Sequence, residues 1–313
     1  MNGVHRPVMV KEALAALTHD GTRGGLFLDA TLGLGGHSEA LLAARADVRV
    51  VGMDQDGEAL AAATSRLAGF GDRFRAVRGN FRDARALLGC EPLDGALMDL
   101  GVSSLQFDTA TRGFSFQRDA PLDMRMDGNG ARKAADLVNG ADRGELERIL
   151  REYGDERAAR RIAAAICEER RSAPLRTTVQ LAGIVARAKG GMKPWQRIHP
   201  STRVFMALRM AVNDEPGALR EGLVAIGSLL VPGARLVAIS FHSVEDREVK
   251  SRFREWKRAG EAHVLTPKPL RPGVVEVEGN PRARSACLRV AEKAGNQFQT
   301  QQGGTDGKKP QKS

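Results

Sequence analysis

Two carboxylates stand at the two ends of a glycine-rich segment near the start of the chain. Asp29 ends one apolar run, and Asp54 ends the next. The turn between them contains three glycines, Gly33, Gly35 and Gly36, and a helix-like segment follows it. Such a strand–loop–helix–strand unit positions a nucleoside-bearing ligand, because glycines let the backbone approach it and leave N–H groups free at the helix start. Asp54, about 20 residues beyond the loop, is placed to accept hydrogen bonds from ribose hydroxyls.

The spacing of the glycines narrows the choice of ligand. A dinucleotide fingerprint has the form G-x-G-x-x-G, and the third glycine is missing here. Asp29, just before the loop, would also repel a pyrophosphate. A carboxylate in this place suits a ligand with a cationic end, such as S-adenosylmethionine, whose sulfonium and ammonium groups are both positive. A tight turn between strand and helix, without any ligand, is the alternative that this segment leaves open.

The elements that hold this unit alternate regularly up to about residue 105. Apolar runs predict strands at 26–30, 48–53, 73–77 and 94–99. Helical periodicity predicts helices near 8–17, 37–45, 57–67 and 82–88. This alternation indicates an α/β fold with a mostly parallel, doubly wound sheet and helices on both faces.

The pattern changes after residue 107. Residues 108–130 are irregular, and helices are predicted beyond them at 133–138, 142–152, 155–171, 177–188 and 201–213. Ser201 and Thr202 are expected to cap the last of these. The α/β pattern then returns with a helix that ends in LLVPG, a strand in ARLVAISFHS, and β-like runs near 262–265 and 286–291.

We therefore expect a discontinuous α/β domain, formed by residues 1–107 and 214–294, and an inserted all-helical domain, residues 108–213. Residues 295–313 are polar and rich in glycine and lysine, which predicts a disordered tail. The insertion leaves after the fourth strand, at the carboxyl edge where ligands bind in doubly wound sheets. An inserted domain in that place would cover the site and contact the substrate.

Polar residues also follow two further strands of the predicted sheet. The fourth strand ends at Asp99, and the fifth ends in SFHS, residues 240–243. Because parallel strands bring their carboxyl ends to one edge, we expect these residues to converge with Asp29 and Asp54. A single Asp at a strand end is often only a turn or cap residue, but four polar ends at one edge favour an active site.

Basic residues are unevenly distributed along the chain. It carries 48 Lys or Arg against 38 Asp or Glu, a net charge of +10. Residues 171–213 contain eight Lys or Arg and no Asp or Glu. This distribution fits a polyanionic partner that docks beside the cofactor site, and a solvated basic face is the alternative.

Other features exclude several classes of protein. No run of about 18 apolar residues occurs, so no membrane-spanning helix is expected. The N-terminal segment lacks the apolar core of a secretory signal, which predicts a cytoplasmic protein. The three cysteines, Cys90, Cys167 and Cys287, have no metal-ligand spacing, so we expect neither a metal site nor a disulfide framework.

Eight segments give the chain a close resemblance to a known family. The most unusual are RGFSFQRDAPLDMRMD (112–127) and SFHSVEDR (240–247). The others are HRPVM (5–9), DATLGLGGHS (29–38), MDLGVSS (98–104), YGDERAARRIA (153–163), HPSTRVFMALRMAVNDE (199–215) and NPRARSACLRVAE (280–292). Together they span nearly the whole chain, and they resemble the bacterial 16S ribosomal RNA cytosine-N4 methyltransferases, the MraW/RsmH family.

The resemblance implies S-adenosylmethionine bound in a Rossmann-like class I methyltransferase sheet. The cofactor contacts that it implies are Gly33, Gly35, Gly36, His37, Asp54, Phe81, Asp99 and Gln106. In this set Asp54 would hold the ribose and Phe81 would lie near the adenine, although Phe81 suits the hydrophobic core equally well. His37 is placed to donate to the cofactor, with a helix-capping role as the alternative.

The implied substrate is a cytidine of 16S ribosomal RNA within the small ribosomal subunit. N4 of cytosine is a poor nucleophile, so the enzyme must place it in line with the methyl group and accept its hydrogens. We expect Asp99 to help hold the amine or the cofactor, and His242 to act as an acid/base or as a structural hydrogen-bonding group. Phe241 and His242 are the preferred stacking platform. Phe114 and Phe116 are the alternative, unless they anchor the insertion to the core.

Arginines on several segments are the expected contacts to RNA phosphates. They are Arg112, Arg118, Arg125, Arg203, Arg282 and Arg284, together with the basic run at 171–213. The first three alternate with Asp119, Asp123 and Asp127, which suits internal ion pairs equally well.

Two other classes of function stay open. An NAD-dependent oxidoreductase shares the strand–loop–helix–strand unit, but the missing glycine and Asp29 disfavour it. A non-catalytic RNA-binding factor would explain the basic insertion but not the acidic strand ends. The residues alone do not separate cytosine N4 from adenine N6 as the target, and that choice rests on the resemblance.

Overall fold

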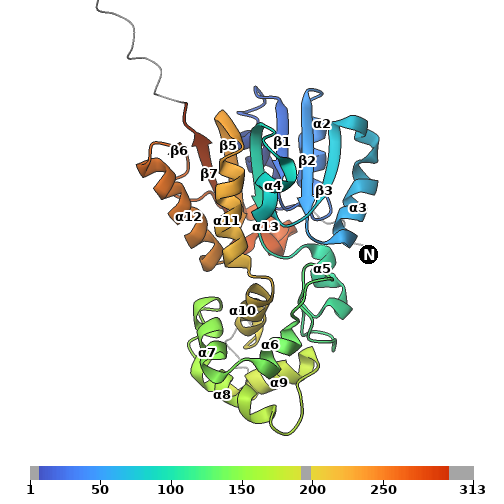
Figure 1. Ribbon diagram of the computed structural model, residues 1–313, viewed down its shortest axis with the longest axis vertical. Helices are drawn as coiled ribbons and strands as arrows, with labels where there is room; N and C mark the ends of the chain where they lie inside the picture. The colour runs from blue at the N-terminus through green and yellow to red at the C-terminus, as the bar shows by residue number, and fades with distance from the viewer. Residues whose placement is uncertain (1–6, 192–198, 296–313) are drawn as a thin grey trace, which may run out of the picture.

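The computed structural model describes residues 7–191 and 199–295, in which a seven-stranded sheet lies above a group of helices (Figure 1). The strands are β1 (Gly25–Asp29), β2 (Val48–Asp54), β3 (Phe74–Arg78), β4 (Leu93–Asp99), β5 (Leu230–Ser240), β6 (Ala262–Val264) and β7 (Cys287–Lys293). Their order across the sheet is β3-β2-β1-β4-β5-β7-β6. Strands β1 to β5 run parallel, and β7 is antiparallel to β5 and β6. The mostly parallel, doubly wound sheet predicted from the sequence is confirmed.

Helices cover both faces of the sheet, because successive residues of a strand point to opposite sides. Phe27 and Val50 pack on the face covered by α1 (Val10–Leu17), α2 (Gly36–Ala44) and α3 (Gly57–Leu67). Leu28 and Val51 pack on the face covered by α4 (Ala84–Leu88), α11 (Glu215–Gly227) and α12 (Ser243–Arg258). Burial of each such side chain contributes roughly 1.5–3 kcal/mol. These two cores hold the strand ends in fixed positions.

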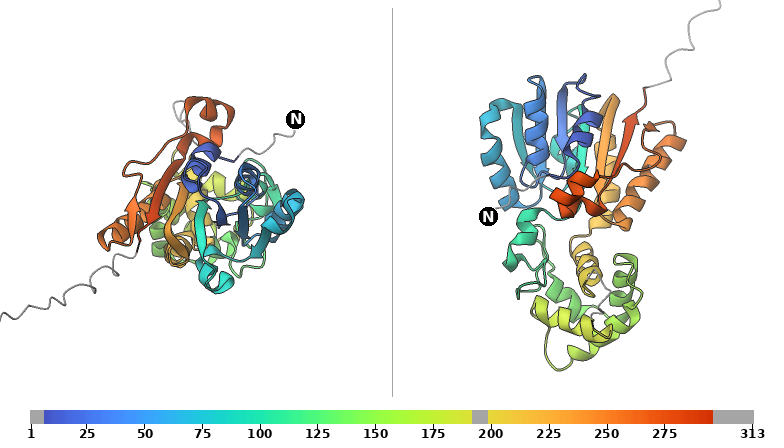
Figure 2. Two further views of the ribbon diagram at one scale, coloured as in Figure 1. Left: turned by 90° about the horizontal axis from the view of Figure 1, so that it is seen from above. Right: turned by 180° about the vertical axis from the view of Figure 1, so that it is seen from behind.

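A separate group of helices, called here the helical group, lies at the carboxyl edge of the sheet. It contains α6 (Ala134–Gly140), α7 (Arg143–Glu152), α8 (Ala159–Glu169), α9 (Thr178–Ala188) and α10 (Thr202–Val212). Its buried side chains, among them Leu146, Ile162 and Leu208, form a core of their own. The chain enters the group through α5 (Ser104–Asp108) and η3 (Ala110–Arg112) and leaves from α10 into α11. The right-hand view of Figure 2 shows both connections.

Short elements complete the described chain. They are the 3₁₀ turns η1 (Ala68–Arg73), η2 (Phe81–Asp83) and η4 (Pro281–Ser285), and the helix α13 (Val274–Gly279). Helices α5 and α13 were not predicted, because five and six residues are too few to show a helical period. None of the described helices is long and apolar enough to cross a membrane.

Three sequence-based expectations differ from the structure or fall outside it. Strand β5 begins at Leu230, so LLVPG belongs largely to the strand and not to α11, which ends at Gly227. The register between β4 and β5 shifts here, which accommodates Pro232 inside the sheet. Ser201 does not cap α10, since its hydroxyl donates to the carbonyl of Ala182 (3.3 Å). The predicted disordered tail lies, from residue 296 on, outside the described residues.

Candidate active site

Four strand ends meet at the carboxyl edge of the sheet. In the parallel registers, Asp29 lies opposite Gly52 and Leu97, and Asp99 lies opposite Ile239. The ends of β1, β2, β4 and β5 therefore form one continuous edge, which faces the helical group (Figure 1). The structure brings together the strand ends that the sequence predicted to converge.

The glycine-rich turn joins β1 to α2 and depends on glycine at two positions. Gly33 has a φ of 52°, in the left-handed region that glycine favours. A Cβ atom on Gly36 would lie 2.8 Å from Cγ of Pro7, so a larger residue does not fit without a shift. The N–H of Gly33 donates to Oδ2 of Asp54 (2.8 Å). This hydrogen bond fixes the loop against the end of β2.

Asp54 holds the loop and remains partly exposed. Its Oδ1 accepts a hydrogen bond from the N–H of Asp56 (2.9 Å). Burial raises the pKa of this carboxyl to about 6, against the lowering effect of the N–H groups of Asp56 and Gly33. Each carboxylate oxygen has a second lone pair, so Asp54 can still accept a hydrogen bond from a ligand hydroxyl.

Asp29 lies beneath the loop. It has no exposed surface, and its Oδ2 accepts the hydroxyl hydrogen of Ser38 (2.7 Å). Burial raises the pKa of Asp29, an effect that His37 and Ser38 oppose. The expectation that Asp29 faces the cationic end of a ligand is therefore not met, because its carboxylate is enclosed. It acts on the site through the charge it places under His37.

His37 and Asp99 face each other across the start of α2 and the end of β4. Nε2 of His37 lies 3.5 Å from Oδ2 of Asp99, and the imidazole is 5% exposed. Burial lowers the pKa of His37, but the carboxylates of Asp99 and Asp29 outweigh this effect and raise the pKa overall. Oδ1 of Asp99 is buried and has no hydrogen-bond partner in the described part of the chain. Both ring nitrogens of His37 also lack a hydrogen-bond partner there. Because buried polar atoms are normally satisfied, Asp99 and His37 are both candidates for a direct hydrogen bond to a ligand.

Asp56, in the turn after β2, connects the strand edge to the segment that leads into the helical group. It accepts a hydrogen bond from Nε2 of Gln106 (2.8 Å) and lies 3.0 Å from Nη2 of Arg112. Arg112 also donates to the carbonyl oxygens of Arg125 and Met126 (3.1 and 2.8 Å). Gln106 and Arg112 are thus engaged within the protein, where they join the two parts of the chain.

The ends of β4 and β5 approach each other at Gly101. This residue has a φ of 102°, and a Cβ on it would lie 3.8 Å from the ring of Phe241 and 4.0 Å from Oε1 of Glu245. Oε2 of Glu245 accepts a hydrogen bond from the N–H of Phe241 (2.9 Å). Glu245 therefore holds the turn that carries Phe241 next to the segment that follows Asp99.

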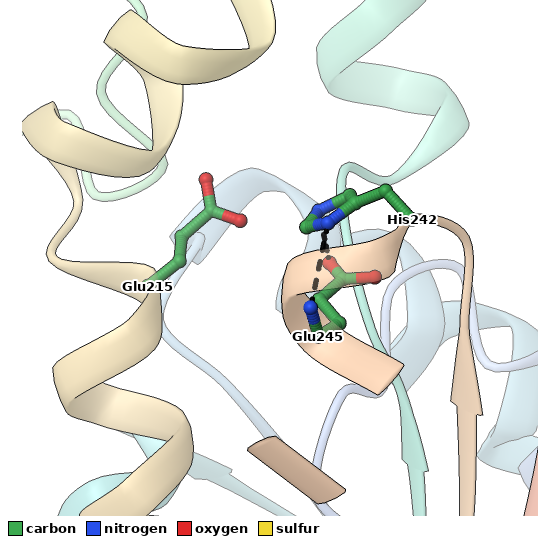
Figure 3. A group of neighbouring side chains, drawn as sticks. All are labelled: Glu215, His242 and Glu245. Atoms are coloured by element: carbon green, nitrogen blue, oxygen red, sulfur yellow. Dashed lines mark hydrogen bonds and ion pairs between the residues drawn. The ribbon is translucent and has the colours of Figure 1, made fainter. Parts of the chain in front are cut away.

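Figure 3 shows Glu215, His242 and Glu245 near one another, at the starts of α11 and α12. Nε2 of His242 lies 2.9 Å from Oε1 of Glu245, and Nδ1 of His242 accepts the N–H of Glu245 at 3.5 Å. Burial raises the pKa of Glu245, but His242 and Arg209 outweigh this effect, so the pKa is lowered overall. The bond to Nδ1 fits the structural role of this histidine, but Nε2 is buried and has no hydrogen-bond partner among the described residues, so the acid/base role stays a prediction as well.

The ligand atoms of these three side chains lie within 4.8 Å of one another, a spacing that suits a cation. A cation is already present as the guanidinium of Arg209. Its Nε and Nη2 each lie 2.7 Å from a carboxylate oxygen of Glu215, and Nη2 lies 4.0 Å from Oε1 of Glu245. Because Arg209 compensates the buried charge of the carboxylates, we assign no metal to this cluster.

Comparison with known proteins identifies the family to which this geometry belongs. Residues 2–294 match one family, described as the MraW methylase family. The chain belongs to this family. Proteins named ribosomal RNA small subunit methyltransferase H are similar over nearly the full length. That of Carboxydothermus hydrogenoformans is 48% identical over 307 residues, with 92% of this chain and 97% of that protein covered. That of Gloeobacter violaceus is 50% identical over 293 residues, with 93% and 88% covered.

In this MraW methylase, the aromatic residues of the irregular segment belong to the helical group. Phe114 is 8% exposed and is part of its core. The ring of Phe116 lies 4.6 Å from that of His199 and 4.9 Å from that of Phe205, measured between centroids. Both rings thus pack within the helical group itself and do not anchor it to the core of the sheet, as the alternative had proposed. Phe241 stays the predicted stacking residue.

Phe81 packs against α11. A Cβ on Gly222 would lie 2.4 Å from Cδ2 of Phe81, and the ring is partly buried against the sheet core. One side of the Phe81 ring therefore packs in the hydrophobic core, which was the alternative to a contact with the cofactor. The contact of Phe81 with an adenine stays a prediction.

Two of the arginines expected to contact RNA are engaged inside the methylase. Nε of Arg125 lies 2.7 Å from Oδ1 of Asp123, and Arg112 is paired with Asp56. Their side chains are 19% and 15% exposed. Both guanidinium groups are thus held in internal ion pairs, the alternative that the sequence left open. Arg125 pairs with the nearby Asp123 as expected, whereas the partner of Arg112 is the distant Asp56.

The other four arginines lie at the surface. Nη1 of Arg203 donates to the carbonyl of Asp155 (3.0 Å), and Nη2 of Arg282 lies 2.9 Å from Oδ1 of Asp108. The side chains of Arg118 and Arg284 are exposed and form no hydrogen bond or ion pair with the described residues. Their contacts with RNA stay predictions.

The sequence did not indicate that Asp56, Arg209 and Glu215 belong to the site. Asp56 carries one usable signal, because an Asp just before a predicted helix is a preferred N-cap, and its side chain does accept the N–H of Glu58. Arg209 and Glu215 carry none, since nothing in their spacing reveals that both approach Glu245.

Proposed function

We propose that this MraW methylase transfers the methyl group of S-adenosylmethionine to N4 of a cytidine in the RNA of the small ribosomal subunit. The names of the relatives support the reaction and the substrate, since they are about half identical to this chain over more than nine-tenths of its length. The observation that carries the proposal is Oδ1 of Asp99, a buried acceptor between the glycine-rich turn and the turn of Phe241.

The charges at the strand edge fit this cofactor better than a dinucleotide. Asp54 and Asp99, which remain partly exposed, place carboxylates around the glycine-rich turn, which disfavours a pyrophosphate and favours a cationic ligand. The partly exposed carboxylate of Asp54 suits ribose hydroxyls. S-adenosylmethionine supplies a methyl group that its sulfonium already activates, so the protein needs to provide placement and acceptors.

The chemistry assigned to the chain's own residues is modest. Asp99 accepts a hydrogen bond from the exocyclic amine and thereby turns the nitrogen lone pair out of the ring plane. The proton that the nitrogen loses on methylation passes to this carboxylate or to water. Phe241 stacks on the base, and Glu245 fixes the turn that carries it. No covalent intermediate is needed, so no nucleophilic cysteine is required at this edge.

The cores support a division of the chain into two domains. We assign residues 1–107 and 214–294 to the methyltransferase domain and residues 108–213 to the domain that contacts the substrate. Asp56 with Arg112 connects the sheet to the beginning of the inserted segment, and Arg82 with Asp214 (2.6 Å) holds the residue that directly follows its end. We place the reaction in the cytoplasm, where small ribosomal subunits are found.

Two measurements test this function. Calorimetry should detect S-adenosylhomocysteine and no NAD, and a labelled methyl donor should transfer its methyl group to small ribosomal subunits. Binding of NAD without S-adenosylhomocysteine would instead support an oxidoreductase. RNA binding without any methyl transfer would support a non-catalytic RNA-binding factor.

A further inference from the structure

A basic hollow lies on the helical group and is lined by none of the residues assigned above. Arg157, Arg160, Arg161 and Ala164 follow one another at helical spacing along one face of α8 and the residues before it. Together with Arg143, at the start of α7, they line a hollow of about 530 Å³. All four arginines are exposed. The hollow therefore presents four guanidinium groups to solvent.

These four arginines differ from the other arginines on the same helices. Arg148 lies 2.9 Å from Glu152, and Arg151 pairs with Glu147 on α7. In the described part of the chain, by contrast, no acid or hydrogen-bond acceptor contacts the guanidinium groups that line the hollow. On the helical group, the nearby Arg148 and Arg151 are thus paired with acids, whereas the four arginines of the hollow have no acidic partner among the described residues.

The position of Arg160 and Arg161 on α8 is also unfavourable in the free protein. They occupy the first turn, which contains no acid. Cations at a helix N-terminus meet the positive end of the helix dipole, and like charges close together on one face repel each other. A bound anion relieves both effects. The arrangement therefore favours an anionic partner over a solvated surface.

Along the chain, the hollow lies close to a segment that contacts the turn carrying Phe241 and His242. Oγ of Ser243, beside His242, donates to Oδ2 of Asp155 (2.6 Å). Arg157 follows Asp155 by two residues, a reach of at most about 7 Å. The segment between α7 and α8 thus touches the turn that carries Phe241 and His242, and the basic hollow begins just beyond it.

We infer that this hollow binds backbone phosphates of the RNA strand that carries the target nucleotide. The inference rests on the proposed function and extends it to a second contact surface. Guanidinium groups bind phosphates in a bidentate manner, and the lining contains no aromatic side chain for stacking on bases. The contact therefore positions the strand without reading its sequence. An interface with a protein would instead have an apolar or aromatic centre.

The test compares two triple variants that lose the same charge. The first combines Arg157→Ala, Arg160→Ala and Arg161→Ala. The control combines Arg132→Ala, Arg148→Ala and Arg151→Ala, whose arginines are paired with acids. Binding of naked 16S ribosomal RNA and of small ribosomal subunits is measured at several salt concentrations. Calorimetry with S-adenosylhomocysteine and thermal unfolding verify that both variants are folded.

We expect the first variant to bind both RNA probes about tenfold more weakly and the slope of log affinity against log salt to fall by about 2, because two to three phosphate contacts are lost. The control should keep the wild-type slope. Equal behaviour of the two variants, or no RNA binding by the wild type, would overturn the inference. Weaker binding to subunits alone would overturn it as well, in favour of a ribosomal protein. Absence of methyl transfer with the expected binding pattern would refute only the proposed function.

Discussion

The β1–β2 end and the β4–β5 end of the strand edge are held in different ways. At the first, backbone N–H groups of Gly33 and Asp56, from the same strand–loop–helix–strand unit, hold the carboxylate of Asp54. At the second, Arg209 and Glu245 belong to different helices, and side-chain charges hold the turn. The first end thus depends on local chain geometry and the second on packing of the helical group onto the sheet. We expect the first end to govern binding of the cofactor and the second end to govern transfer of the methyl group to RNA.

The largest effect is expected at Asp99, the last residue of β4 at the second end. Asp99→Ala should lower turnover about 100-fold or more, because it removes the acceptor for the exocyclic amine. Single-turnover methyl transfer to small ribosomal subunits measures it. Asp94→Ala, at the other end of β4, is the control, since Asp94 accepts the N–H of Leu26 (2.9 Å) and lies far from the edge along the strand. Normal turnover of Asp99→Ala would refute its role.

A smaller effect, confined to the cofactor, is expected at Asp54. Asp54→Asn should weaken the binding of S-adenosylhomocysteine about 30-fold, as is typical when hydrogen bonds to a charged group are lost. Calorimetry measures the affinity. Asp47→Asn is the matched control, because the exposed Asp47 lies before β2 and, among the described residues, forms an ion pair with Arg45 alone. An unchanged affinity for Asp54→Asn would remove Asp54 from the cofactor site.

The opposite pattern is expected at Glu245. Glu245→Gln should raise the KM for small ribosomal subunits about tenfold and leave the affinity for S-adenosylhomocysteine within about twofold, because the turn of Phe241 loses its charged anchor. Glu255→Gln, on the exposed face of the same helix, is the control. If Glu245→Gln weakened cofactor binding as much as it raised KM, the two ends would not act separately.

The smallest effect is a dependence on pH at the first end. The pKa of Asp54 is raised to about 6, so its ionised form is disfavoured in the folded protein. The contribution of Asp54 to the free energy of unfolding therefore falls as pH rises from the ordinary pKa of an aspartate through 6. Ribose hydroxyls that donate to the carboxylate favour the ionised form. Affinity for S-adenosylhomocysteine should therefore rise about threefold from pH 5.5 to 6.5. Asp54→Asn should abolish this rise, and a rise of equal size in that variant would assign it to another group.

The same comparison explains how much the sequence revealed. The roles of β1, β2 and the glycine-rich turn were predictable, because strand periodicity and glycine spacing are properties of neighbouring residues. The enclosure of Asp29 was not, because it results from Ser38 turning back from α2 to the end of β1.

At the second end, the sequence indicated Asp99 and the SFHS turn but not their supports. Arg209 and Glu215 reach Glu245 only after α10, α11 and α12 have packed together. Arg112 was predicted to bind phosphate or to pair with a nearby acid, and it pairs with Asp56 instead. Such contacts between distant segments depend on tertiary packing, which periodicity and spacing do not encode.

The central claim is that this edge methylates the exocyclic amine of a cytidine. The most direct measurement is mass analysis of nucleosides from small ribosomal subunits that have been incubated with S-adenosylmethionine and either the wild-type protein or Asp99→Ala. The account predicts N4-methylcytidine with the wild type and at least about 100-fold slower formation with the variant. A methylated adenosine, a C5-methylated cytidine, or equal rates for both proteins would contradict it.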